Sequence, residues 1–237
     1  MIVVPAIDLR DGACVQLRGG SYDDELVRLD DPVGVAAWWR DLGFTTLHVV
    51  DLDAATGRGD NAAITAAICA LEGVAVQAGG GVRDDAGVAR LLGAGASSVI
   101  VGTRAIAEPH WLATIVAANP GRISVAVDVR SGVVTTEGWQ RQTALVPHEV
   151  VAALEPLALR QVLATAVDVE GSARGPDLEL VAALRAATRH PLGIAGGVAS
   201  ARDLDALRDL GVDAVVVGTA LYTGALDPEG LNQELHR

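Results

Sequence analysis

A chain of 237 residues with a formal net charge of −12 is a poor partner for nucleic acid or an anionic membrane surface, because its overall field repels phosphate backbones. All 18 basic residues are arginine, which excludes catalysis through a Schiff base to an enzyme lysine, pyridoxal phosphate attachment and a Walker phosphate loop, since each needs a lysine. With two cysteines, no signal peptide and no apolar run of about 18 residues, we expect a soluble cytoplasmic protein that has no disulfide framework.

Short apolar runs bounded by turn residues predict eight strands, over residues 2–7, 46–52, 74–78, 97–101, 122–127, 161–167, 191–195 and 213–217. Helical patterns fall between them, at residues 32–42, 60–71, 84–94, 108–118, 147–156, 177–188, 200–210 and 228–236. A strand followed by a helix eight times over predicts an α/β fold, one (β/α)8 barrel that spans residues 1–237.

The second half of the chain repeats the first. The motif that begins at Gly80 returns at Gly196, and the Gly-Thr pair that begins at Gly102 returns at Gly218. Further upstream, Asp8 and its neighbours return around Asp128. A period this long is not that of a solenoid. It predicts a barrel built from two duplicated half-barrels, about residues 1–120 and 121–237.

The repeated glycines predict two phosphate sites. They lie where a strand ends and a helix begins, so that bare backbone N–H groups point at an anion. One site contains Gly80, Gly81, Gly102 and Thr103, with Arg83 beside it; the other contains Gly196, Gly197, Gly218 and Thr219. We therefore expect a small substrate with one or two phosphates. The alternative is that these glycines only permit tight turns, and that Arg83 caps its helix.

Two carboxylates are candidates for the chemistry. Asp8 and Asp128 end the first and fifth strands, which face each other across the mouth of such a barrel. Carboxylates on opposite sides of a pocket can serve as general acid and general base, although each could instead cap a helix or pair with an arginine. Asp51 and Asp53 are candidate metal ligands, but no His or Cys cluster supports them, so neither a metal nor a cofactor is expected.

Several motifs, taken together and in order, resemble the ProFAR isomerase family of histidine biosynthesis. They are PAIDLRDG (5–12), LHVVDLD (47–53), AGGGVR (78–83), VGT (101–103), VDVRSG (127–132), GW (138–139), GPD (175–177), AGGV (195–198) and VGTALYTG (217–224). The resemblance covers essentially the whole chain and is closest to the actinobacterial phosphoribosyl isomerase A branch, which also acts in tryptophan synthesis. It implies a cofactor-free Amadori rearrangement, in which an aminoaldose becomes an aminoketose.

The resemblance also implies roles for individual residues. Asp8 would be the base, Asp128 the acid that opens the ribose ring, Thr165 would assist, and Trp139 would stack on the aromatic part of the substrate. Glu170 is a further catalytic candidate, at a position where the family usually has aspartate. The other substrate contacts implied are Gln16, Arg18 and His48, and the residues offer for His48 the alternative of a hydrogen-bonded side chain inside the barrel.

Some positions depart from the family pattern and favour a narrowed or shifted substrate range. Gln16 and Glu137 stand where the family usually has arginine, Ala166 stands for aspartate, and Ala195 for serine. The two phosphate sites and Trp139 favour ProFAR, which has a phosphate at each end. Three alternatives stay open: an isomerase specialised for phosphoribosylanthranilate, a cyclase of the same ancestry, and a non-catalytic barrel that binds phosphoribosyl metabolites. We expect a monomer.

Overall fold

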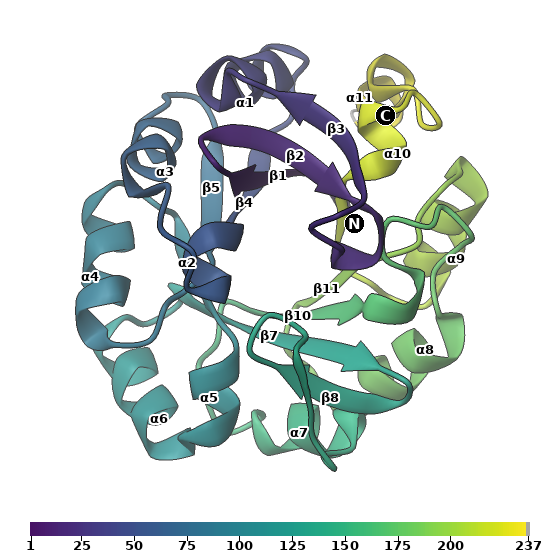
Figure 1. Ribbon diagram of the computed structural model, residues 1–237. Helices are drawn as coiled ribbons and strands as arrows, with labels where there is room; N and C mark the ends of the chain where they lie inside the picture. Colours follow the sequence, from purple (N-terminus) through teal and green to yellow (C-terminus); the bar gives the residue numbers. More distant parts are fainter. Residues whose placement is uncertain (236–237) are drawn as a thin grey trace.

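The computed structural model describes residues 1–235, and its parallel strands close into a barrel (Figure 1). These strands are β1 (Ile2–Arg10), β4 (Thr46–Asp51), β5 (Ala75–Gly79), β6 (Ser98–Val101), β7 (Ile123–Arg130), β10 (Gln161–Ala166), β11 (Leu192–Ala195) and β12 (Ala214–Val217). The last strand, β12, pairs with β1, so the parallel ladder closes on itself. The predicted (β/α)8 barrel is confirmed.

Helices surround this barrel (Figure 1). The longer ones are α1 (Pro32–Asp41), α3 (Ala62–Cys69), α4 (Asp85–Gly93), α6 (Pro109–Ala118), α7 (Pro147–Ala153), α8 (Leu178–Ala187), α9 (Ala201–Asp209) and α11 (Pro228–Leu235). Each falls within its predicted range, and residue 236 of the last range lies outside the described residues. None of the helices within residues 1–235 combines the length and hydropathy that crossing a bilayer requires.

Helix boundaries follow from local chemistry. The carboxylate of Asp31 accepts a hydrogen bond from Gly34 N–H, and Pro32 occupies the first turn of α1, where its missing N–H is no loss. Past the end of α1, Gly43 has a φ of 93°, a left-handed conformation that glycine adopts without strain. Three short helices were not predicted: α2 (Leu52–Thr56), α5 (Thr103–Ala107) and α10 (Thr219–Tyr222), each directly after a barrel strand.

Alternate strand residues pack into two separate cores. One set faces the helices, and the other fills the inside of the barrel with small and branched side chains: Val4, Ala6, Ile100, Leu163, Ala195, Ala214 and Val216. The inside of the barrel is therefore packed, as is usual for this architecture, and is no channel. A site for a small molecule has to lie at the mouth, above this packed layer.

Two of the barrel strands continue beyond the mouth into hairpins. β1 turns at Asp11-Gly12 into β2 (Ala13–Leu17), and β7 turns at Ser131-Gly132 into β8 (Val133–Thr136). All four turn residues have positive φ, as a type I′ turn requires, and the Asp-Gly pair is a sequence signal that could have predicted the first hairpin. Each hairpin gains one more strand, β3 (Glu25–Leu29) and β9 (Arg141–Gln142). The hairpins lie on opposite sides of the mouth (Figure 1).

Candidate active site

Three carboxylates gather at the mouth of the barrel. Asp8 lies near the end of β1 and Asp128 near the end of β7, and three strands separate β1 from β7 in either direction around the barrel. Glu170 follows β10, just after the short 3-10 helix η2 (Val167–Val169). Each of the three residues keeps part of its surface exposed, although the surrounding protein desolvates its carboxyl group. The two aspartates therefore face each other across the mouth, and the structure brings the glutamate to the same place.

All three carboxyl groups have a raised pKa, mainly because they are buried. Burial and the charge of Glu170 raise the pKa of Asp8 to about 7. Burial raises the pKa of Glu170 to about 7, partly offset by a hydrogen bond from the Gly171 N–H and reinforced by the charge of Asp128. A proton-transfer group works best when its pKa is close to the pH at which the enzyme operates. Asp8 and Glu170 thus have the acidity that acid–base catalysis needs near neutral pH.

Asp128 differs from the other two because side chains donate hydrogen bonds to it. Burial raises its pKa, whereas hydrogen bonds from Thr165 and Trp139 lower it. Thr165 is its direct partner on the neighbouring strand β10, and Trp139 comes from the loop between β8 and β9. Donors of this kind favour the ionised carboxylate. These hydrogen bonds therefore offset part of the effect of burial, and the pKa of Asp128 stays raised.

The second glycine-rich site forms a pocket beside Glu170. It is lined by Glu170, Gly171, Ala173, Gly196, Gly197, Val198, Val216, Val217, Gly218, Thr219 and Ala220. The glycines are also a packing requirement, because a Cβ at Gly197 would lie 2.2 Å from the carbonyl oxygen of Gly175. The turns therefore need glycine for close packing, and the same glycines line the pocket.

The first glycine-rich site lies below the loop after β8. A Cβ at Gly80 would lie 2.3 Å from the carbonyl oxygen of Asp51, so this backbone, too, packs closely. The hydroxyl of Thr103 accepts a hydrogen bond of 2.8 Å from the Glu137 N–H and keeps its own proton free to donate. Arg83 donates to the carbonyl oxygens of Ala54 and Ala55. Its guanidinium therefore holds the backbone of α2 in place beside the first glycine-rich site.

Three loops meet over the mouth. Gly20, in the loop after β2, lies against the ring of Trp139, and Arg130 donates to the Trp139 carbonyl oxygen at 3.1 Å. The N–H of Gly19 donates to the carbonyl oxygen of Glu170 at 3.1 Å, which joins the first loop to the one after β10. The indole of Trp139 therefore covers the mouth from one side and reaches Asp128.

The remaining sequence candidates lie around this centre. Gln16 is buried on β2, where its side-chain oxygen faces the Thr219 hydroxyl at 3.5 Å, next to the second glycine site. Arg18 forms an exposed ion pair with Asp24 at 3.5 Å. His48 is buried, its Nδ1 lies 3.2 Å from Gln77 Nε2, and burial lowers its pKa to about 4. It takes the interior position that the sequence left as the alternative.

Asp51 and Asp53 are occupied by hydrogen-bond donors. The carboxylate of Asp51 accepts from the N–H groups of Ala54 and Asn61 and from the Asn61 side chain. That of Asp53 accepts from the Asp11 N–H and from the same Asn61 side chain. No group of three or more His, Cys, Asp and Glu side chains suited to a metal ion occurs among residues 1–235. The geometry gives both aspartates a structural role.

Comparison with known proteins shows the family of this chain. Residues 2–227 match the family described as histidine biosynthesis protein. A protein of Myxococcus xanthus is 48% identical over 235 residues, and one of Gemmatimonas aurantiaca is 46% identical over 234, with 99% of both chains covered in each case. A protein of Methanothrix thermoacetophila is 42% identical and covers 95% of this chain and 94% of its own. All three are named 1-(5-phosphoribosyl)-5-((5-phosphoribosylamino)methylideneamino) imidazole-4-carboxamide isomerase.

Proposed function

The chain belongs to the histidine biosynthesis protein family and is an isomerase like its named relatives; from this premise we propose that it converts ProFAR, the substrate in those names, into the corresponding aminoketose. The observation that carries the proposal is the placement of Asp8 and Asp128 on opposite sides of a mouth that also holds both glycine-rich sites. A substrate with a phosphate at each end could lie across the barrel, with its reacting ribose between the two carboxylates.

The proposed chemistry uses these side chains and no cofactor. Asp128 protonates the ring oxygen of the ribose, the bond between that oxygen and C1 breaks, and a Schiff base forms. Asp8 then removes the proton from C2, which gives an enolamine. The enolamine tautomerises to the aminoketose as C1 gains a proton and the C2 hydroxyl loses one. The raised pKa of Asp8, about 7, suits a base that must take up and release a proton near neutral pH. Thr165 orients Asp128 through its hydrogen bond.

We propose that Glu170 influences the protonation of both aspartates. Its pKa of about 7 and its electrostatic coupling to both aspartates mean that a proton taken up by one carboxylate changes the acidity of the others. Its carboxylate also lines the second glycine-rich pocket. We propose that Glu170 retains a proton when the phosphate is bound there, because two negative charges so close would otherwise repel each other.

We propose that phosphoribosylanthranilate is at best a poor second substrate. Its carboxylate replaces one phosphate and calls for a cation at the mouth. Gln16 is neutral, Glu137 is acidic and paired with Arg141, and Arg18 is paired with Asp24. Within residues 1–235, these positions offer the anthranilate no free guanidinium. The proposal includes the monomeric state expected from the sequence, since one chain supplies every group named above. It also includes the cytoplasmic location expected from the sequence.

Steady-state turnover of ProFAR and of phosphoribosylanthranilate, measured separately, tests the proposal. The wild type should convert ProFAR, and Asp8→Asn and Asp128→Asn should each lose at least about a thousandfold in kcat, as expected for a general acid or base. Turnover of phosphoribosylanthranilate at a comparable kcat/KM would show a dual-substrate enzyme. Absence of turnover with either substrate, together with tight binding of ProFAR, would favour the non-catalytic binding barrel.

A further inference from the structure

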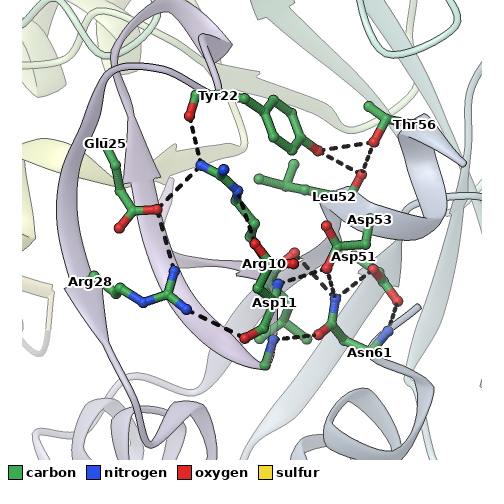
Figure 2. Close-up of polar contacts among 12 residues, drawn as sticks. Arg10, Asp11, Tyr22, Glu25, Arg28, Asp51, Leu52, Asp53, Thr56 and Asn61 are labelled. Atoms are coloured by element: carbon green, nitrogen blue, oxygen red, sulfur yellow. Dashed lines mark hydrogen bonds and ion pairs between the residues drawn. The ribbon is translucent and has the colours of Figure 1, made fainter. Parts of the chain in front are cut away.

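A buried polar cluster lies beneath the turn of the first hairpin (Figure 2). It consists of Asp51, Asp53 and Asn61, whose exposed fractions are 6%, 5% and 6%. Asp51 ends β4, Asp53 lies in α2, and Asn61 immediately precedes α3. None of them has a role in the proposed chemistry. The cluster nevertheless lies close to it, because β4 pairs with β1 and places Leu9, the neighbour of Asp8, beside Asp51.

Asn61 joins the cluster to the hairpin through every polar atom of its side chain. Its Nδ2 donates to Asp51 Oδ1 and to Asp53 Oδ2, both at 2.9 Å, and lies 3.5 Å from the carbonyl oxygen of Leu9. Its Oδ1 accepts from the Gly12 N–H at 3.0 Å. The side chain thus contacts the hairpin both just after Asp8 and at the turn. It is a direct connection between α3 and the strand that carries the proposed base.

Asp53 makes the second connection. Its Oδ2 accepts the Asp11 N–H at 2.7 Å as well as the Asn61 amide. Both turn residues, Asp11 and Gly12, therefore have their N–H groups satisfied by this cluster. A hydrogen bond from a backbone N–H to a buried carboxylate is among the stronger ones in proteins. The turn is held at two consecutive residues, which leaves it little freedom to shift.

The two carboxylates of the cluster are hydrogen-bonded by neutral N–H groups. Among the ion pairs formed by residues 1–235, none involves Asp51 or Asp53. Two buried carboxylates are therefore stabilised by N–H groups, of which the Asn61 amide is shared by both. An aspartate at position 61 would direct a third carboxylate at the other two, and buried like charges repel strongly. The neutral amide of asparagine thus suits this position better than a carboxylate.

The second hairpin is held more simply, which makes the first one distinctive. The Ser131 N–H donates to Asp168 Oδ2 at 2.6 Å, in the position that matches Asp11 and its carboxylate in the first half. Asp168 is exposed, and no amide side chain bridges it to a second carboxylate in the contacts of residues 1–235. Of the two hairpins, only the one that carries Asp8 has its turn held by a buried carboxylate.

The α2 helix, which contains Asp53, also contacts the loop between β2 and β3. The Tyr22 hydroxyl donates to the Leu52 carbonyl oxygen at 2.8 Å and lies 3.1 Å from the Thr56 hydroxyl, both in α2 (Figure 2). The guanidinium groups of Arg10 and Arg58 each lie over its ring, at 4.7 and 4.2 Å from the ring centre. The segment from α2 to Asn61 therefore contacts both the β1–β2 turn and, at Tyr22, the loop that follows β2.

We propose that Asn61 and Asp53 are positioning residues for Asp8: they fix the β1–β2 hairpin so that the Asp8 carboxylate and the first loop stand at the correct place over the mouth. The inference rests on the proposed function, because it assigns Asp8 the role of base. It adds residues that lie outside the mouth and touch no substrate. Misplacement of a reacting group by about 1 Å can lower a rate by about a hundredfold.

The test compares Asp53→Ala with Asp53→Asn, and Asn61→Ala with Asn61→Asp, in the full chain. Asparagine at position 53 can still accept from Asp11 and Asn61 through its oxygen, so its kcat should stay within about threefold of wild type. Asp53→Ala and Asn61→Ala should lose about ten- to a hundredfold in kcat with KM changed less than about threefold, because the glycine-rich sites remain intact. Asn61→Asp should lose at least as much as Asn61→Ala.

Ile68→Val, in the α3 helix that Asn61 precedes, is the control for lost packing, since Ile68 is fully buried and its aliphatic side chain can form no hydrogen bond to the hairpin turn. It should lower thermal stability and leave kcat unchanged. Equal loss in Asp53→Asn and Asp53→Ala, or wild-type kcat in both alanine variants, would overturn the proposal. Hydrogen exchange at the Asp11 and Gly12 amides gives a readout independent of turnover: faster exchange is expected in Asp53→Ala, and unchanged exchange would refute the connection even if the wild type proved inactive on ProFAR.

Discussion

Gly20 and Trp139 are in direct contact across two loops that are far apart in the sequence: a Cβ at Gly20 would lie 2.3 Å from Cζ3 of the indole ring. The first loop can therefore approach the indole only because residue 20 has no side chain. Since Trp139 also donates to Asp128, this contact links the position of the first loop to the acid side of the mouth.

Gly20→Ala should separate the two loops and lower kcat/KM by about tenfold or more, because the methyl group must displace the indole from Asp128. Gly19→Ala is the matched control. Gly19 also has a positive φ, 57° against 69° for Gly20, but a Cβ there meets nothing within 4 Å. Both variants carry the strain of a left-handed alanine, about 1–2 kcal/mol, so comparable thermal melts are expected. Equal kinetic losses in both would show that strain, and not the contact, matters.

The hydroxyl of Thr165 should matter through Asp128. Thr165→Val keeps the shape of the side chain but removes the donor, and we expect kcat/KM to fall by about ten- to a hundredfold, the usual effect of losing a hydrogen bond to a charged group. Thr165→Ser keeps the donor and should retain most of the activity. Steady-state kinetics on ProFAR decide the matter, and similar values for the serine and valine variants would contradict it.

Asp8→Asn should stabilise the protein at alkaline pH. The pKa of Asp8 rises from about 3.8 to about 7 on folding, so between these pH values the folded state holds more protons than the unfolded state. Its contribution to stability therefore falls as the pH rises from about 4 to about 7 and stays low above that. Asparagine carries no charge to desolvate, so its melting temperature should exceed that of the wild type by a few degrees at pH 8.

That difference should shrink towards pH 4, where Asp8 is protonated in the folded protein. Thermal melts of both proteins between pH 4 and pH 8 provide the measurement. Asp30→Asn serves as the control, because the Asp30 side chain is 94% exposed, and its melting temperature should show no such trend relative to wild type. A constant difference across this range would mean that burial of the Asp8 charge does not limit stability.

The two glycine-rich sites should act mainly on binding. Thr103→Val removes a hydroxyl whose proton is free for a phosphate, and Thr219→Val removes one that lines the second glycine-rich site and would exchange its weak bond to Gln16 for the phosphate. Each should raise KM for ProFAR by about tenfold with a smaller change in kcat. Thr223→Val is the matched control, because the Thr223 hydroxyl is exposed and donates to the Thr219 carbonyl oxygen. Inhibition by inorganic phosphate should weaken in the first two variants alone. An effect confined to kcat would place these hydroxyls in the chemistry instead.

The order of strands and helices could be predicted because it depends on local patterns. Buried strands appear as short apolar runs, and helix boundaries such as Asp31-Pro32 depend on neighbouring residues. The repeat of Gly80-Gly81 at Gly196-Gly197 located both glycine-rich sites for the same reason, since a glycine turn is a property of a few consecutive residues. The two hairpins were missed because a short β-ribbon has weak local signals, apart from the Asp-Gly turn.

By itself, then, the amino-acid sequence determined the barrel, its two glycine-rich sites and the strand ends at which Asp8 and Asp128 lie. The tertiary structure alone decided which side chains meet there. Glu170 beside Asp8, Trp139 on Asp128 and against Gly20, and Asn61 between two buried aspartates are contacts between segments 8 to 162 residues apart. The physical reason is that hydrogen bonding, desolvation and the pKa of a carboxyl group depend on neighbours in space, and no local pattern encodes how three loops pack over one mouth.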